Sequence, residues 1–278
     1  MEQEVLLIDC PDQKGLVHKI TGVLYDHGLN IISNQEFVDA ATDHFFMRTA
    51  FEGSDNSGQI EQDLNSVLPD AAHIRLTPRG NRSVVVMATK EPHCLGDLLL
   101  RYRYGELPAD IKAVISNHAT LGSLADSFDI PFHCVSHEGV SRRDHEQKIT
   151  EIINEYDPDY LVLAKYMRIF TPEFIDQYPE RIVNIHHSFL PAFAGASPYR
   201  QAFERGVKII GATAHFVTED LDEGPIIAQD VTPVNHTYTA RQMAQAGRDV
   251  EKVVLARALQ LVLEERVFIH NNRTIVFD

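Results

Sequence analysis

Three polar side chains in the second half of the chain have the chemistry to stabilise an oxyanion and move a proton. Asn184 and His186 lie two residues apart at the end of residues 181–185, a short β-branched and apolar segment that predicts a buried strand. Side chains two apart on a strand share a face, so we expect Asn184 and His186 to point one way and His187 the other. Asp222 follows in an acidic turn. An amide, an imidazole and a carboxylate suit oxyanion stabilisation and proton transfer near neutral pH.

The residue types alone favour a structural interpretation. An Asn-x-His at a strand end can cap a loop, and Asp-Glu-Gly-Pro is common turn chemistry. His215 ends a predicted strand at 208–217 and could be a buried structural residue or a functional one. Residue types therefore leave both interpretations open.

Three motifs, matched in spacing without insertion, resemble the signature of folate-dependent formyltransferases. They are Asn184-x-His186-x-Ser188-x-Leu190-Pro191, Gly211-Ala212-Thr213-Ala214-His215-Phe216-Val217 and Leu221-Asp222-x-Gly224-Pro225-Ile226-Ile227. The resemblance implies catalytic roles for Asn184, His186 and Asp222, and a substrate-binding role for His215.

The segment Lys165 to Phe170 follows a predicted strand at 160–163 and is similar to the folate-cleft loop of the same family. The resemblance implies that Met167, Ile169 and Phe170 form apolar walls around the pterin. Arg168 would either meet the glutamate tail of folate or only pack. Taken alone, the segment would be interpreted as an ordinary loop.

Composition excludes several classes of function. The chain has 278 residues, 44% apolar content and a formal charge of −15, with no Lys/Arg cluster, which disfavours a nucleic-acid partner. No apolar run is long enough for a membrane span, and Met1 to Glu4 lacks the basic start of a signal peptide. Cys10, Cys94 and Cys134 are odd in number and far apart, so we expect buried free thiols in a cytoplasmic protein. No cluster of metal ligands is evident.

Residues 1–82 predict a first domain with the order βαββαβ, the ferredoxin-like arrangement. The predicted strands are 5–8, 31–38, 44–51 and 73–76, and the helices are 16–27 and 59–68. Asp12-x-x-Gly15-Leu16-Val17 and Gly28-Leu29-Asn30-Ile31 resemble ACT domains. This resemblance implies an amino-acid effector site at Asp12, Gly15, Leu16 and Asn30, and a homo-oligomer, because such domains usually pair. Alternatively, Gly15 and Gly28 serve only turns.

Residues 83–278 predict a second domain, an open and mostly parallel α/β sheet, after a linker at 78–82. Its predicted strands include 83–88, 111–115, 132–135, 160–163, 181–185, 208–217 and 224–228, and helices alternate with the first of these. A long helix at 240–264 carries an apolar stripe that includes Val250 and Val253. A hairpin around Asn271-Asn272 closes the chain. Ligands on such sheets bind beyond the carboxyl ends of the strands.

The loop after the first strand of this domain departs from the glycinamide ribonucleotide formyltransferases, where it is rich in Gly and Ser and holds a phosphate. Here Pro92 removes an amide donor, and Glu91 and Asp97 bring negative charge. We therefore predict that Thr89, Lys90, Glu91 and Pro92 close the acceptor site.

Together the two domains resemble the formyltetrahydrofolate deformylases. The resemblance implies hydrolysis of 10-formyltetrahydrofolate to formate and tetrahydrofolate, which would supply formate for one-carbon and purine metabolism, without cofactor or metal. The alternatives are a formyltransferase to an amine acceptor such as glycinamide ribonucleotide, a methionyl-tRNA formyltransferase, which would need a basic extension, and a non-catalytic amino-acid sensor.

Overall fold

The structure is a computed structural model that describes residues 3–53, 57–77, 80–192 and 198–277. Pro78 and Arg79 of the predicted linker lie outside these residues. The chain divides into two compact units. The first comprises Met1–Gly80, Glu265–Phe268 and Val276–Asp278, and the second comprises Asn81–Glu264 and Ile269–Ile275.

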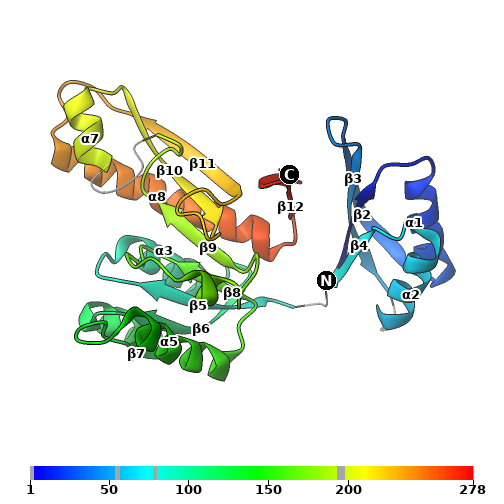
Figure 1. Cartoon of the computed structure of the whole chain (residues 1–278), viewed down its shortest axis with the longest axis horizontal. Helices are drawn as coiled ribbons and strands as arrows, with labels where there is room; N and C mark the ends of the chain where they lie inside the picture. Colours follow the sequence, from blue (N-terminus) through cyan, green and yellow to red (C-terminus); the bar gives the residue numbers. More distant parts are fainter. Residues whose placement is uncertain (1–2, 54–56, 78–79, 193–197, 278) are drawn as a thin grey trace. The chain divides into compact units, whose positions relative to one another are not determined.

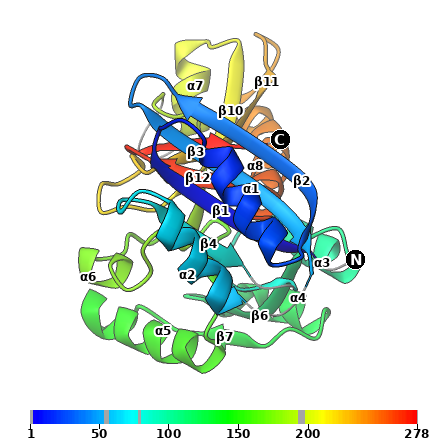
Figure 2. The same ribbon diagram turned by 90° about the vertical axis from the view of Figure 1, so that its right-hand side faces the viewer.

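The first unit is a four-stranded antiparallel sheet with two helices over one face, as Figures 1 and 2 show. Its elements are β1 (Glu4–Pro11), α1 (Leu16–Asp26), β2 (Asn30–Asp39), β3 (His44–Glu52), α2 (Ser57–Val67) and β4 (His73–Thr77). The strand order is β2-β3-β1-β4. The predicted βαββαβ arrangement is therefore confirmed. Leu16, Ile20 and Leu24 of α1 are buried at helical spacing and enter the core of this unit.

The C-terminal hairpin is divided between the two units. The sequence had predicted that all of it belongs to the second domain. It consists of β12 (Val267–His270) and β13 (Arg273–Val276). The ring of Phe268 meets the ring of Phe46 on β3 edge-on, with centroids 5.5 Å apart. Arg48 on the same strand donates a hydrogen bond to the carbonyl of Glu265. These contacts place the start of the hairpin in the first unit.

The second unit is a seven-stranded sheet with the order β11-β10-β9-β8-β5-β6-β7 (Figure 1). Five strands are parallel, and β10 and β11 are antiparallel to their neighbours, so the predicted open, mostly parallel sheet is confirmed. The strands are β5 (Arg82–Ala88), β6 (Ala109–Ser116), β7 (Phe132–Cys134), β8 (Tyr160–Leu163), β9 (Ile182–His186), β10 (Ile209–Phe216) and β11 (Ile226–Pro233).

Helices cover both faces of this sheet. They are α3 (His93–Arg103), η1 (Ala119–Leu121), α4 (Gly122–Asp126), α5 (Arg142–Tyr156), α6 (Pro172–Ile175), α7 (Pro198–Arg205) and α8 (Ala240–Leu263). Val85 and Met87 of β5 share a buried cluster with residues of α5 and α6. The long helix α8 contacts β9, β10, β11 and α3. Thr239 begins α8 with a capping box, in which its side chain and that of Gln242 satisfy each other's backbone amides.

Several details differ from the sequence-based expectations. The four-residue helix α6 was not predicted, and β11 extends to Pro233 rather than ending at residue 228. Val253 is 51% exposed although it was expected on the apolar stripe of α8, and Glu251 takes the buried position. Cys134 is exposed, whereas Cys10 and Cys94 are buried as expected. In the described part of the chain, no helix is long and apolar enough to cross a membrane.

Candidate active site

A cavity of about 520 Å³ opens beyond the carboxyl ends of β8 and β9. This is the edge of a parallel sheet at which ligands bind. We call it the main pocket. All the residues expected to bind or convert the substrate line it, namely Asn184, His186, Asp222, His215, Met167, Arg168, Ile169 and Phe170.

Asn184 and His215 are held opposite each other by the register of two strands. They are paired across β9 and β10, and the Asn184 Nδ2 atom lies 3.2 Å from the His215 Nε2 atom. The Nδ1 atom of His215 donates to the carbonyl of Phe216 at 2.8 Å, which leaves Nε2 as the acceptor. Burial lowers the pKa of His215, so the ring is neutral. One N–H of Asn184 is thereby directed at His215, and its second N–H is left for a ligand.

His186 is held by Asp222. The His186 Nδ1 atom lies 3.1 Å from a carboxylate oxygen of Asp222, and the Nε2 atom is buried with no hydrogen-bonding partner among the described residues. The hydrogen bond from His186 lowers the pKa of Asp222, so this carboxylate is ionised at neutral pH. A buried imidazole nitrogen without a partner is costly unless a ligand satisfies it.

The turn that carries Asp222 is tightly constrained. Asp222 has a φ of 60°, in the left-handed region that Asp tolerates better than most residues. A Cβ atom at Gly224 would overlap the carbonyl oxygen of Phe216, so this position has no room for a side chain. The amide of Phe216 in turn donates to the carbonyl of Pro225 at 2.9 Å. The turn is thus closed against the end of β10, and it places the carboxylate beside His186.

The segment 165–170 forms the apolar side of the main pocket. Met167 and Ile169 are 58% and 53% exposed, which is unusual for apolar side chains that line a cavity and typical of a ligand-binding surface. Phe170 is buried and stacks on Phe174, with centroids 4.1 Å apart. The amide of Met167 donates to the hydroxyl of Thr89, which ties this segment to the loop after β5. Arg168 is half-buried and has no ion-pair partner among the described residues.

Strand alternation predicted that His187 points away from Asn184 and His186, but β9 ends at His186, and His187 lines the same pocket as these two residues. Its ring lies 5.0 Å from that of His186, and it lines both the main pocket and a second cavity of about 360 Å³. Burial, and then the positive charge of Lys165, lower the pKa of His187 to about 4. It is therefore a neutral hydrogen-bonding group at physiological pH.

The second cavity is lined by Lys165, Tyr199 and Glu251, which form one polar group with His93. The sequence did not predict this group. Glu251 on α8 accepts a hydrogen bond from His93 Nε2 at 2.7 Å, and its other oxygen accepts one from the hydroxyl of Tyr199. Lys165 Nζ lies 3.3 Å from the oxygen that His93 contacts. Burial opposes ionisation of Glu251, but these two hydrogen bonds and the charge of Lys165 lower its pKa to about 2.

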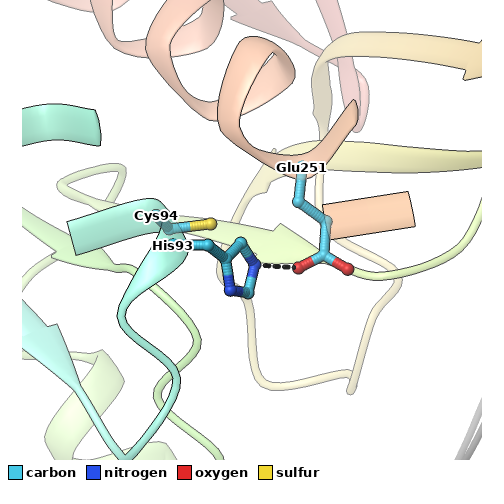
Figure 3. A group of neighbouring side chains, drawn as sticks. All are labelled: His93, Cys94 and Glu251. Carbon is cyan, nitrogen blue, oxygen red and sulfur yellow. Dashed lines mark hydrogen bonds and ion pairs between the residues drawn. The ribbon is translucent and has the colours of Figure 1, made fainter. Parts of the chain in front are cut away.

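His93, Cys94 and Glu251 lie close enough together to suggest a metal site, and Figure 3 shows them side by side. Their chemistry does not suit one. Both oxygens of Glu251 are already hydrogen-bonded, and the ammonium of Lys165 lies where a cation would have to bind. Burial and the negative charge of Glu251 raise the pKa of the Cys94 thiol, which opposes the thiolate form that metals require. The group is therefore an ion-paired cluster.

The predicted effector residues lie around the start of α1 and of β2. Asp12, Gly15 and Asn30 are exposed, and Gly15 has a φ of 88° at the cap of α1. Leu16 is 2% exposed and packs in the core of the first unit. Leu16 is therefore not accessible to a ligand. Asp12 lies beside Asp43, just before β3 begins, whereas Asn30 pairs with Glu52 at the other end of β3, so the expectation of one site that includes Asn30 is wrong.

Comparison with known proteins links this geometry to two families. The Formyl transferase family model matches residues 82–259, and the ACT domain model matches residues 5–69. A formyltetrahydrofolate deformylase from Escherichia coli O6:H1 is 59% identical over 276 residues, which cover 99% of each chain.

Solved structures agree with this. The crystal structure of a formyltetrahydrofolate deformylase from Pseudomonas syringae pv. tomato has a TM-score of 0.95 and 41% identity, with 100% of this chain and 95% of that chain covered. Glycinamide ribonucleotide transformylase 1 from Symbiobacterium toebii has a TM-score of 0.69 and 32% identity, with 71% of this chain and 95% of that chain covered. The whole chain is thus similar to the first structure, whereas 71% of the chain is similar to the second.

Proposed function

This chain belongs to the formyltetrahydrofolate deformylases, and on that premise we propose that it hydrolyses 10-formyltetrahydrofolate with Asn184, His186 and Asp222. The observation that carries the proposal is the state of His186. Its Nδ1 atom is held by Asp222, and its Nε2 atom is buried and without a protein partner at the wall of the main pocket.

Stabilisation of the developing oxyanion falls to Asn184 and His186. The formyl carbon is a poor electrophile because N10 donates electrons into the carbonyl. Attack by water places negative charge on the formyl oxygen, which the free N–H of Asn184 and a protonated His186 Nε2 can both contact. The neutral His215 fixes the orientation of the Asn184 amide.

Asp222 supplies the fixed negative charge. Because its pKa is lowered, the carboxylate is ionised at neutral pH, and it holds Nδ1 of His186 by a hydrogen bond. It also orients the water and relays its proton toward N10, which leaves badly as an anion. In balance, the water oxygen bonds to the formyl carbon, the bond from that carbon to N10 breaks, N10 takes up one proton, and the other proton is released with formate.

The folate is bound by the segment 165–170. Met167, Ile169 and Phe170 offer apolar surface to the pterin, and backbone groups of the same segment contact its edge. The guanidinium of Arg168 binds the glutamate carboxylates of the substrate; in support, Arg168 lines the main pocket and lacks an ion-pair partner among the described residues.

The first unit adds a regulatory site and an assembly surface. An amino acid binds near Asp12 and Gly15, which are exposed where β1 ends beside His44 of β3. The chain forms a homo-oligomer through β2, the edge strand of that sheet, which exposes Ile32 at 43% and Phe37 at 44%.

The decisive experiment is an anaerobic assay of the purified full chain with 10-formyltetrahydrofolate and no acceptor. Stoichiometric release of formate and tetrahydrofolate is expected. Strict dependence of turnover on glycinamide ribonucleotide would refute hydrolysis in favour of formyl transfer. Running the assay with glycine and with methionine tests the effector site in the same experiment.

A further inference from the structure

Lys165 has a backbone conformation that its residue type disfavours. Its φ is 65°, in the left-handed region, and its side chain is only 4% exposed. A long charged side chain is seldom buried, and a residue with a Cβ atom seldom adopts this backbone. Such outliers persist where the surroundings fix them, and they concentrate at functional sites. Lys165 is therefore a candidate functional residue.

The side chain of Lys165 is fixed by Glu251, itself fully buried. Lys165 Nζ lies 3.3 Å from Oε2 of Glu251, and His93 and Tyr199 hold both oxygens of that carboxylate. Gly247 stands one turn before Glu251 on α8, and a Cβ atom there would overlap the ring of Tyr199. The donors come from the loop after β8, from α3 and from α7, so three segments converge on a carboxylate that a fourth, α8, carries.

This ion pair stands between two cavities. Lys165, Met167 and His187 line both the main pocket and the second cavity, and they form the wall that separates them. Folate fills the main pocket in the proposed function. A second reactant, if one is used, then has to approach the formyl carbon from the second cavity, past Lys165.

We propose that Lys165, held by Glu251, is the specificity-determining residue that admits water to the formyl group and excludes primary amines. The proposal rests on the proposed function above. A water molecule occupies only about 30 Å³ and can pass through a narrow gap between the side chains of this wall. An ammonium group is repelled by the charge of Lys165, and the buried carboxylate of Glu251 beside it is already hydrogen-bonded at both oxygens. This wall makes the chain a hydrolase where related folds carry out transfer.

The two reactions differ only in the nucleophile. In transfer to an amine, the amine nitrogen forms the new bond to the formyl carbon and loses a proton, the bond to N10 breaks, and N10 takes up a proton. The same oxyanion donors serve both reactions. Removal of the Lys165 side chain should therefore permit transfer to an amine, and it leaves the groups needed for hydrolysis in place.

The test uses the full chain with the substitution Lys165→Gly, which removes the side chain and also suits the left-handed backbone. Each protein receives 10-formyltetrahydrofolate and increasing glycinamide, and formate and formylglycinamide are quantified separately by mass spectrometry. For the wild type we expect formate alone. For Lys165→Gly we expect the ratio of formylglycinamide to formate to rise by at least about tenfold, the scale on which a site discriminates small groups. The KM for 10-formyltetrahydrofolate should change much less.

Two controls accompany it. Lys112→Gly removes a lysine paired with Asp110 at 2.5 Å on the surface, away from both cavities, and should behave as the wild type. Lys165→Arg keeps the charge and bulk and should restore strict hydrolysis.

A folded Lys165→Gly protein that releases only formate at every glycinamide concentration overturns the proposal. If that variant does not fold, Tyr199→Phe loosens the same cluster by one hydrogen bond, and a strictly hydrolytic Tyr199→Phe protein overturns it equally. A wild-type protein that releases no formate without an acceptor refutes the proposed function instead, so the two failures are distinguishable.

Discussion

The Nδ1 atom of His186 lies 3.1 Å from a carboxylate oxygen of Asp222, although one residue ends a strand and the other stands in a distant turn. This contact fixes the orientation of the imidazole and leaves Nε2 without a protein partner at the wall of the main pocket. Every step of the proposed hydrolysis depends on that orientation.

Asp222→Asn should lower kcat by about 10²–10⁴, the usual contribution of acid–base groups, because an amide has no negative charge and cannot accept a proton from the attacking water. His186→Ala should fall in the same range. Steady-state formate release checks both, and Asp249→Asn on the exposed face of α8 is the matched control. Near-wild-type kcat in either variant would remove the pair from the mechanism.

Asn184→Ala should lower kcat by about 10²–10³ with little change in KM, because one oxyanion donor is lost and the folate surface is retained. The measurement is the separate determination of kcat and KM. A variant whose KM rises while kcat is unchanged would mean that Asn184 only binds the substrate.

His187 should make the protein less stable as the pH falls. Its pKa is about 4 in the folded chain, below the ordinary value, so between about pH 6.5 and pH 4 the unfolded chain binds a proton that the folded chain does not. The contribution is fully present above pH 6.5 and shrinks by at most about 2 kcal/mol on lowering the pH to 5. Urea unfolding of wild type and His187→Asn at pH 8 and pH 5 measures it. Equal losses in the two proteins would contradict the prediction.

Gly224→Ala should reduce both stability and kcat, because the added Cβ overlaps the carbonyl oxygen of Phe216 and the turn must shift Asp222 away from His186. Gly22→Ala on α1 has open space around the new methyl group and should be neutral or stabilising by up to about 1 kcal/mol. Thermal melts and formate release compare the two. Full activity in Gly224→Ala would show that the turn tolerates the shift.

The proposed effector site predicts that glycine or methionine changes either formate release or the melting temperature, and that Asp12→Ala abolishes the response without affecting the basal rate. Asp12 is exposed and contributes its amide, not its side chain, to a hydrogen bond with Asp43, so its replacement should not unfold the first unit. If amino acids leave both quantities unchanged in the wild type, the site has no effector role.

Local patterns predicted most of the fold. Helix α1 follows from the spacing of Leu16, Ile20 and Leu24, and β5 from an unbroken apolar run, because both signals lie within a few residues. The helix α6 has four residues, too few to show a period, and β11 continues through Gln229 and Asp230, polar residues tolerated on an edge strand.

The candidate site, like the fold, was predicted in part from the sequence. Asn184, His186 and Asp222 were found through contiguous motifs, and the structure brings them to one pocket. The cluster around Glu251 was not found, because its members come from four segments that meet only in the folded chain. One signal was present in the sequence. Glu251 lies four residues after Gly247 and four before Leu255, so it occupies a core-facing position of α8 where an apolar residue is expected.

The cluster around Glu251 also restricts which residue can occupy position 247. Gly247 has no side chain and makes no bond to the reactants, yet the ring of Tyr199 occupies the space where even one methyl group would go. A saturation screen scored by formate production should therefore find an intolerant position on α8 that no inspection of reactive groups would select. The substitutions that α8 tolerates are therefore limited by the ring of Tyr199 as well as by the charged group that this ring supports.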